Sequence, residues 1–412
     1  MLAKMLTKRT SHLSLLGCLL LTACTIGIVQ RKEIVRDEPG TTATATPDAI
    51  AETTLAALQT ENAILTTRAA ISNHTVWSWD AYTAADMQID PALQDHTVGG
   101  TPFIYDVAIA PDGVWVGSQY GISHFAGTWT TYTYFDGNWV NYATDESMPT
   151  SYVMSSVRTV AVAPDGTVWL GGEMGITSFD GARWTTHSNS TLLDTEGHHI
   201  AARNIAIGHD GTLWVSTYFS LTCFDGQTWT SYPVPIYSTP DGPSPPIQYD
   251  IAVAHDGSVW GAAWPDAYHF DGSAWTFYVV AGDDRLERTV NATTITDAGL
   301  EGTIDAYAVA ITDDDTVWFG GGMGIASFDG TSWASYDLPS GLHNIADMAL
   351  APDGSLWAGG HGGISHFDGH NWTTYTVADG LIYHIARSIA IADDGTVWVG
   401  TESGLSRYGP LP

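Results

Sequence analysis

Three arginines occupy the same position in a recurring motif, and they are the residues of this chain best suited to bind a charged group. Each lies seven residues before the aspartate of an Asp-Gly turn, although the 412 residues include only 14 Lys and Arg against 45 Asp and Glu. A guanidinium offers two parallel donors to a carboxylate, a sulfate or an acidic sugar. Three tyrosines occupy this position in other copies of the motif. We therefore expect the six side chains to form one anion-binding site, unless each arginine instead pairs with a nearby acid. The six residues are Arg158, Arg203, Arg387, Tyr105, Tyr249 and Tyr307.

Aromatic residues form a second candidate group, in turns at the same end of the motif as the arginines. Tyr120, Tyr218 and Trp264, with Phe219 beside Tyr218, come from three copies of the motif. Aromatic faces suit stacking on sugar rings or apolar ligands. The alternative is that these side chains pack against the neighbouring copy of the motif.

Titratable residues form a third candidate group. Glu173, His361 and Glu402 lie in equivalent turns of three other copies. A histidine and two carboxylates can bind a divalent cation or perform acid–base catalysis, but ordinary solvated loop residues give the same pattern. The triple acid Asp313–Asp315 lacks the interleaved ligands of a calcium loop and is expected to be a turn. Motifs for nucleotides and catalytic nucleophiles are absent, so we expect no cofactor and no metal, and we favour binding without catalysis.

A sequence repeat positions all of these side chains. Asp-Gly-x-x-Trp or a close variant occurs seven times, and each copy has an alanine four residues before the turn aspartate, within a strand pattern of period two. A repeat of about 40 to 50 residues is typical of propeller blades, and small residues allow inner strands to crowd toward an axis. Each copy is therefore expected to form a four-stranded antiparallel blade. The seven tryptophans are Trp115, Trp169, Trp214, Trp260, Trp318, Trp357 and Trp398.

The last repeat lacks the outer Trp-x-x-Tyr strand that other repeats carry. The missing segment occurs upstream of the first repeat, at Trp79–Tyr82. An N-terminal strand that completes the last blade would close the ring and remove an exposed edge. The sequence therefore predicts an all-β fold, a seven-bladed β-propeller over residues 73–412 with an N-terminal strand closing the last blade. The first blade has two candidate outer strands, at Trp129 and Trp139.

The two ends of such a propeller are expected to differ. The Asp-Gly turns share one end, and because they are short and regular we expect that end to be featureless. The variable turns share the other end, which we call the loop-rich end. Variable loops on a rigid scaffold usually carry binding sites, so the ligand is expected there.

The N-terminal residues have the charge order of an export signal. Basic residues precede an apolar run, Leu13–Leu21, that is too short to span a bilayer. The following Leu21–Cys24 resembles the bacterial lipobox, which implies that Cys24 is diacylated. We therefore expect a signal peptide at 1–23, a lipid-anchored tether at 24–72 and an extracytoplasmic propeller on the inner or the outer membrane. Apolar residues at 3-4 spacing within 47–70 leave two alternatives, a solvated tether helix and a weakly self-associating stalk.

The net charge of −31 argues against nucleic acid as a partner, because phosphate backbones require clustered Lys and Arg and no lysine follows Lys32. The same charge repels anionic lipid. Contact with the membrane is therefore expected through the lipid anchor only. The expected partners are a small molecule, a glycan or a protein that binds the loop-rich end.

The last repeat carries a family resemblance. Asp394–Thr401, followed by Gly404–Tyr408, resembles the repeat of two-component regulator propellers. These form the extracytoplasmic sensor region of bacterial sensor kinases, so the resemblance implies ligand binding, carbohydrates included, here by a stand-alone lipoprotein. Two alternatives remain open. One is a glycan-binding lectin similar to tectonin propellers, and the other is a metal-assisted lyase or hydrolase that resembles virginiamycin B lyase and would use Glu173, His361 and Glu402.

Overall fold

The computed structural model describes residues 77–87, 102–135, 138–141, 156–172, 175–187, 201–239, 242–244, 246–264, 266–279, 294–297, 306–322 and 324–410. These residues belong to one compact unit, Thr75–Pro412. The predicted signal peptide, Cys24, the segment 47–70 and Glu173 lie outside the described residues.

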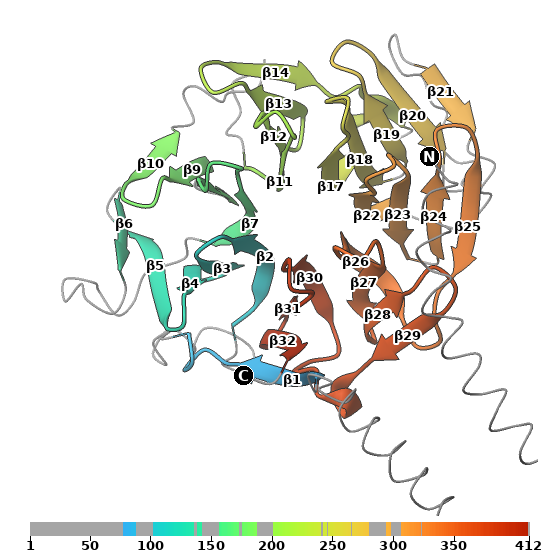
Figure 1. The fold of residues 1–412 in the computed structure, drawn as a ribbon. Coiled ribbons are helices and arrows are strands. Elements are labelled where there is room, and N and C mark those ends of the chain that lie inside the picture. The colour runs from blue at the N-terminus through green and yellow to red at the C-terminus, as the bar shows by residue number, and fades with distance from the viewer. Residues whose placement is uncertain are drawn as a thin grey trace, which may run out of the picture. The chain divides into compact units, whose positions relative to one another are not determined.

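Seven sheets, each built on antiparallel strands, follow one another around a common centre (Figure 1), which confirms the seven-bladed β-propeller. Blade 1 contains β2 (Ile104–Ala110), β3 (Gly113–Ser118), β4 (Gly121–Phe125), β5 (Trp129–Phe135) and β6 (Asn138–Asn141). Blade 2 contains β7 (Val157–Val162), β8 (Val168–Gly172), β9 (Gly175–Phe179) and β10 (Trp184–His187). Blade 3 contains β11 (Asn204–Ile207), β12 (Leu213–Ser216), β13 (Ser220–Phe224) and β14 (Trp229–Pro233).

The remaining four blades continue the same pattern. Blade 4 contains β17 (Ile247–Val253), β18 (Val259–Trp264), β19 (Ala267–Phe270), β20 (Trp275–Val279) and β21 (Thr294–Asp297), the last parallel to β20. Blade 5 contains β22 (Ala306–Ile311), β23 (Val317–Gly321), β24 (Gly324–Phe328) and β25 (Trp333–Asp337). Blade 6 contains β26 (His343–Leu350), β27 (Leu356–His361), β28 (Gly363–Phe367) and β29 (Trp372–Tyr375). Blade 7 contains β30 (Ala386–Ile391), β31 (Val397–Thr401), β32 (Gly404–Pro410) and β1 (Trp77–Tyr82). A hairpin, β15 (Tyr237–Thr239) and β16 (Gly242–Ser244), follows blade 3, and a 3-10 helix, η2 (Val377–Asp379), follows blade 6.

The core lies between neighbouring blades. Six of the seven repeat tryptophans are buried, and each packs on aromatic rings of the next blade, as Trp169 does on Phe224 at 5.7 Å. Burying one large aromatic side chain contributes about 2 to 3 kcal/mol. Close approach of the blades requires small residues, since a Cβ at Gly171 would lie 2.7 Å from Ala202 of blade 3. The repeated Trp and Gly therefore serve packing between blades.

The strands that carry the repeated alanines are innermost, as predicted. The first strands of successive blades contact one another, so that β2 touches both β7 and β30. The predicted closure is also confirmed, because β1 pairs with β32 in antiparallel register and Trp79 lies opposite Tyr408. In blade 1 both candidate outer strands form, as β5 and β6.

A polar ring, for which the repeat pattern gave no prediction, bridges the innermost strands. One carboxyl in each of blades 1, 4 and 6 accepts a backbone N–H bond from an inner strand of the following blade, and its pKa is raised by burial. The pKa is about 6 for Asp106, about 7 for Asp250 and well above the ordinary value for Asp347. The donors are Val160 N to Asp106 Oδ2 at 2.7 Å, Val309 N to Asp250 Oδ2 at 2.9 Å and Ile389 N to Asp347 Oδ2 at 2.6 Å.

Candidate functional site

A β-bulge near the loop-rich end of the inner strand positions the predicted anion-binding residues. In blades 1, 2, 4, 5 and 7 the residue seven positions before the turn aspartate is the single residue that the strand ladder skips. A bulge leaves one residue unpaired and re-aims its side chain. The skipped residues are Tyr105, Arg158, Tyr249, Tyr307 and Arg387. Backbone geometry, which the repeat position alone did not reveal, thus sets these five apart from the ladder.

Two aromatic rings lie between two arginines in a row that runs from blade 7 to blade 2. The guanidinium of Arg387 lies 5.6 Å from the ring centre of Phe103, and Phe103 lies 4.8 Å from Tyr105. Arg158 of the next blade lies 5.6 Å from the ring centre of Tyr105. A cation over an aromatic face is attracted by the ring quadrupole. The structure therefore brings Tyr105, Arg158 and Arg387 into one connected group.

The other predicted residues form two further pairs at this end. Arg203 lies 4.5 Å from the ring centre of Tyr218, and within the described part of the chain no carboxylate pairs with it. Tyr249 and Tyr307, from blades 4 and 5, meet edge to face at 4.9 Å. These contacts link the predicted residues as one trio and two pairs.

Arg387 and Glu402 differ from the prediction, because they pair with each other. Arg387 Nε donates to Glu402 Oε1 at 3.0 Å, and its Nη2 contacts the same oxygen. The alternative of a local acid therefore holds for this arginine. It also leaves Glu402 engaged with a permanent cation, which does not favour a role as acid, base or metal ligand.

His361 lies beside this pair. Burial is the main cause that lowers its pKa, followed by the charges of Arg387 and His343, while Glu402 opposes them. Its ring is 5.3 Å from that of His343. Among the described residues, no three His, Cys, Asp or Glu side chains converge in a way that could hold a metal ion. Glu173, the third predicted member, lies outside the described residues.

Exposed aromatic side chains gather at the loop-rich end of blades 3 and 4. Tyr218 is 50% exposed and Trp264 is 44% exposed, and Phe219 and Ile247 are exposed as well. Ile247 lies opposite Trp264 in the ladder. Tyr120 differs from the prediction: it is 5% exposed and packs in the core between blades 7 and 1.

The prediction that the Asp-Gly end is featureless is wrong. Cavities of about 480 Å³ and about 620 Å³ open there along blades 5 to 7. The triple acid Asp313–Asp315 is a turn, as expected, and Asp315 Oδ1 lies 2.8 Å from His255 Nδ1 of blade 4. Within the described residues, no helix has the length and apolar character that a membrane crossing requires.

Comparison with known proteins identifies the fold. The chain matches no protein-family model and no curated protein sequence. Among solved structures, virginiamycin B lyase from Staphylococcus aureus is 13% identical with a TM-score of 0.56, over 82% of this chain and 100% of that one. The extracellular domain of a proposed one-component system from B. thetaiotaomicron is 15% identical with a TM-score of 0.54, over 80% of this chain and 39% of that one. YCF48 bound to D1 peptide is 14% identical with a TM-score of 0.50, over 80% and 96%.

The chain shares the propeller fold of these proteins. Its similarity to extracellular sensor propellers agrees with the resemblance found in the last repeat. At this level of identity the likeness concerns the fold, and the chemistry of the site has to be argued from the residues of this chain.

Proposed function

We propose that this chain is an extracytoplasmic propeller that binds an anionic ligand at its loop-rich end, without catalysis. The observation that supports the proposal best is the placement of Arg203 and Arg158. Both guanidiniums lie over aromatic rings at the end of an inner strand, in a protein with a net charge of −31. An anion that approaches so acidic a surface needs a local reversal of sign, and these arginines supply it.

The fold neighbours support the same class of function. Extracellular domains of one-component and two-component systems share the fold, and another neighbour is described as bound to a peptide. The lyase alternative has weaker support, because Glu402 is engaged by Arg387.

The first test replaces both Arg158 and Arg203 with Ala. Loss of one hydrogen bond to a charged group costs about 1.5 to 3 kcal/mol, so the dissociation constant for trigalacturonate, measured by calorimetry, should rise at least about tenfold. The fully methyl-esterified trisaccharide should bind parent and variant alike. Arg183→Ala removes one positive charge from an exposed turn at the other end and serves as the control for each of the two single Ala variants. Equal affinity of parent and double variant for trigalacturonate would contradict the proposal.

A glycan-binding lectin is the second candidate, and the exposed Tyr218, Phe219 and Trp264 favour it. Stacking on sugar rings is largely independent of charge. If Trp264→Ala weakens binding of a neutral oligosaccharide that the arginine variant still binds, the aromatic patch is the recognition surface.

The lipid anchor is tested separately. Replacing Cys24 with Ser should release the protein from the membrane fraction, because Cys24 is the residue expected to carry the acyl chains and stable anchoring takes two such chains. The measurement is fractionation followed by immunoblotting, with Cys18→Ser as the control. A Cys24→Ser protein that stays with the membrane would rule out this anchor.

A further inference from the structure

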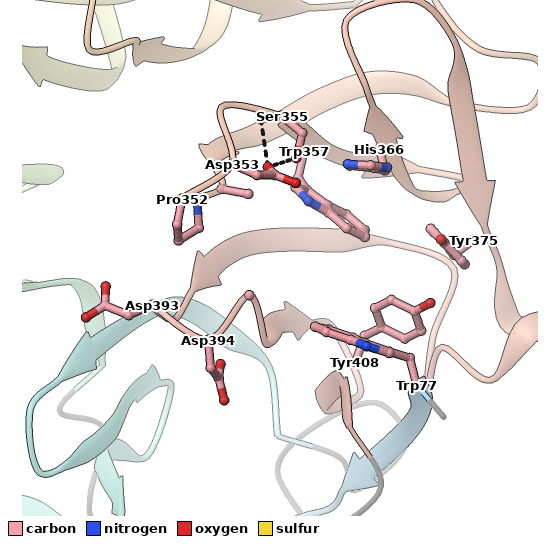
Figure 2. Close-up of a pocket in the computed structure, with 12 residues that line it drawn as sticks. Trp77, Pro352, Asp353, Ser355, Trp357, His366, Tyr375, Asp393, Asp394 and Tyr408 are labelled. Carbon is pink, nitrogen blue, oxygen red and sulfur yellow. Dashed lines mark hydrogen bonds between the residues drawn. The ribbon is translucent and has the colours of Figure 1, made fainter. Parts of the chain in front are cut away.

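A cavity of about 480 Å³ opens at the Asp-Gly end, between blades 6 and 7 (Figure 2). It lies at the opposite end of the inner strands from the arginines, since β30 pairs Ile391 with Val397 at the Asp-Gly end and Ala386 with Thr401 at the loop-rich end. The cavity has an aromatic side and an acidic side. Among the residues that the structure describes, no lysine or arginine lines it.

The way the ring closes creates this cavity. In blade 6 a tight Asp-Gly turn joins the last two strands directly after the pair Phe367 and Trp372. In blade 7 the fourth strand comes from the N-terminus, so no turn is needed and the ladder continues for two further pairs, up to Trp77 opposite Pro410. Trp77 therefore has no counterpart in the hairpins of the other blades. Its ring remains 38% exposed.

Aromatic rings from both blades form one side of the cavity. The ring centres of Trp77 and Tyr408 lie 5.3 Å apart. The ring centre of Trp357 lies 5.7 Å from that of Tyr375 and 6.2 Å from that of Tyr408. Burial, with a contribution from Tyr408, raises the pKa of Tyr375 to about 12, so this phenol is neutral at physiological pH. The faces of such rings carry negative partial charge and attract cations.

Three carboxylates form the other side. Asp353 Oδ1 accepts hydrogen bonds from Ser355 Oγ at 2.6 Å and Ser355 N at 3.0 Å, which hold the pKa of Asp353 below its ordinary value. Asp394 Oδ1 accepts a bond from Thr396 N at 2.9 Å. Asp393 is exposed beside them. The basic residue next to Tyr408, Arg407, is already paired with Asp80 at 3.0 Å and lies over Trp398.

The corresponding end of blades 3 to 5 is built differently. There His209 stacks on His255 at 4.1 Å, and His255 Nδ1 lies 2.8 Å from Asp315 Oδ1. Imidazoles thus bridge those blades and engage an acid. Blades 6 and 7 have Pro352 and Asp393 at the positions of these histidines, so no imidazole pair bridges the two blades there. His366 lines the cavity on its aromatic side, 4.6 Å from the ring centre of Trp357, and its charge contributes to the lowered pKa of Asp353.

We propose that this cavity binds a small organic ammonium ion, with the cationic head between the aspartates and the aromatic rings. An ammonium group satisfies both sides at once, whereas a neutral molecule would leave the carboxylates without a countercharge and an anion would be repelled. The bound ion would contact blade 6 and two parts of blade 7, its C-terminal strands and the N-terminal strand β1. Binding should therefore hold the ring closed and raise the melting temperature, since a ligand specific for the folded state stabilises it.

Choline is the probe, and 3,3-dimethylbutan-1-ol is its neutral isostere. Titration calorimetry and thermal melts are done in 150 mM NaCl, where the Debye length is about 8 Å and distant charges are screened. We expect choline to bind with a dissociation constant on the order of 1 mM and to raise the melting temperature, and the alcohol to do neither. Equal effects of choline and the alcohol, or no effect of choline up to about 50 mM, would overturn the proposal.

Two sets of variants locate the site. Asp353→Asn with Asp393→Asn should weaken choline binding at least about tenfold, whereas Asp165→Asn, in the equivalent turn of blade 2, should leave it unchanged. Trp77→Ala should weaken it about threefold to tenfold and Trp77→Phe by less. Because Trp77→Ala can loosen blade 7, the melting temperature of each variant is first measured without ligand. If the Ala variant is unstable, the test relies on the Asn variants. A double Asn variant that folds and binds choline like the parent would show that the cavity is not the site.

Discussion

Removal of β1 should open the ring and abolish cooperative unfolding. Six residues of this strand pair with β32, and Asp80 Oδ2 accepts a bond from Arg407 Nη1 at 3.0 Å. Without β1, the strand β32 becomes an unprotected edge in blade 7, and such edges favour aggregation. We expect a protein that lacks residues 73–84 to melt at a much lower temperature over a broad range, or to be insoluble.

The large rings of β1 account for much of the expected loss. Trp79 lies 4.9 Å from Tyr408 and 5.9 Å from Tyr375 of blade 6, whereas Tyr82 stacks on Trp398 at 5.7 Å. Truncating a large buried side chain costs about 3 to 5 kcal/mol, and since both rings are only partly buried we expect about 2 to 4 kcal/mol each. The free energy of unfolding in urea measures the loss.

The control for this prediction is Val377→Ala. That side chain is 52% exposed, so its truncation should change the free energy of unfolding by less than about 0.5 kcal/mol. If Trp79→Ala and Tyr82→Ala are as mild as this control, closure of the ring contributes little to stability and the prediction is wrong.

Most of the fold could be predicted because every blade of a propeller must meet the same packing requirements, so the same residue types recur seven times in the sequence. A single Trp or Ala would mean little, but an alanine four residues before every turn aspartate indicates strands that crowd toward an axis, and those strands are innermost. The missing strand of the last repeat was likewise predictable, because one Trp-x-x-Tyr segment was left over at Trp79–Tyr82. Local repetition therefore determined both blade number and closure.

The candidate site could be predicted only in part, because repeat position gives the end of a strand but not the partner of a side chain. Arg387 and Glu402 are fifteen residues apart and meet across the β30–β31 ladder, a contact that register alone brings about. Tyr120 looks like a loop residue, but its side chain is buried between two blades. The cavity at Trp77 was missed although a signal was present: Trp77 precedes Trp79 by two residues and has no equivalent in any other repeat.

The polar ring was missed for a related reason. Six residues before the turn aspartate the repeats carry Asp106, Thr159, Asn204, Asp250, Ala308, Asp347 and Ser388. A polar residue recurring within an apolar strand was the available signal. Its meaning depends on the bulge beside it and on donors from the next blade, which the sequence of one strand does not contain.

Loss of one of these carboxyls should be among the most damaging single changes in the protein. Asp250 Oδ1 accepts bonds from Ile251 N at 2.8 Å and Asn204 Nδ2 at 2.6 Å, and Oδ2 accepts one from Val309 N. Asp250→Ala leaves three donors without partners, and each unsatisfied buried donor costs about 1 to 3 kcal/mol. We expect a loss of about 3 to 6 kcal/mol in the free energy of unfolding. The exposed Asp165→Ala, which removes one bond to Thr167 N, should cost about 1 kcal/mol or less.

The same ring predicts how stability depends on pH. Burial raises the pKa of Asp106 to about 6 and of Asp250 to about 7, and burial together with the charges of the other two raises that of Asp347. Because the folded state holds these protons more tightly than the unfolded state, the contribution of Asp106 and Asp250 is fully present below pH 4 and is lost as pH rises through 6 to 7. The contribution of Asp347 is lost in the same direction, as pH rises. Four partly buried histidines have the opposite effect over part of this range, because their lowered pKa values make stability rise with pH. They are His124, His187, His269 and His361.

A comparison of parent and variant isolates the carboxyl from these histidines. Asp106→Asn keeps an acceptor for Val107 N or Val160 N but cannot ionise, so it loses the stabilisation that the protonated acid provides at pH 5 and also escapes the cost of a buried charge at pH 8. The difference in free energy of unfolding between parent and Asp106→Asn should therefore shrink from pH 5 to pH 8, by on the order of 2 kcal/mol. Urea unfolding midpoints at four or five pH values measure this change. Asp165→Asn is the control, for which the difference in free energy of unfolding from the parent should stay constant with pH. A difference that stays constant or grows with pH would mean that Asp106 is already ionised throughout this range, and that the ring is held together by charged hydrogen bonds instead of protonated ones.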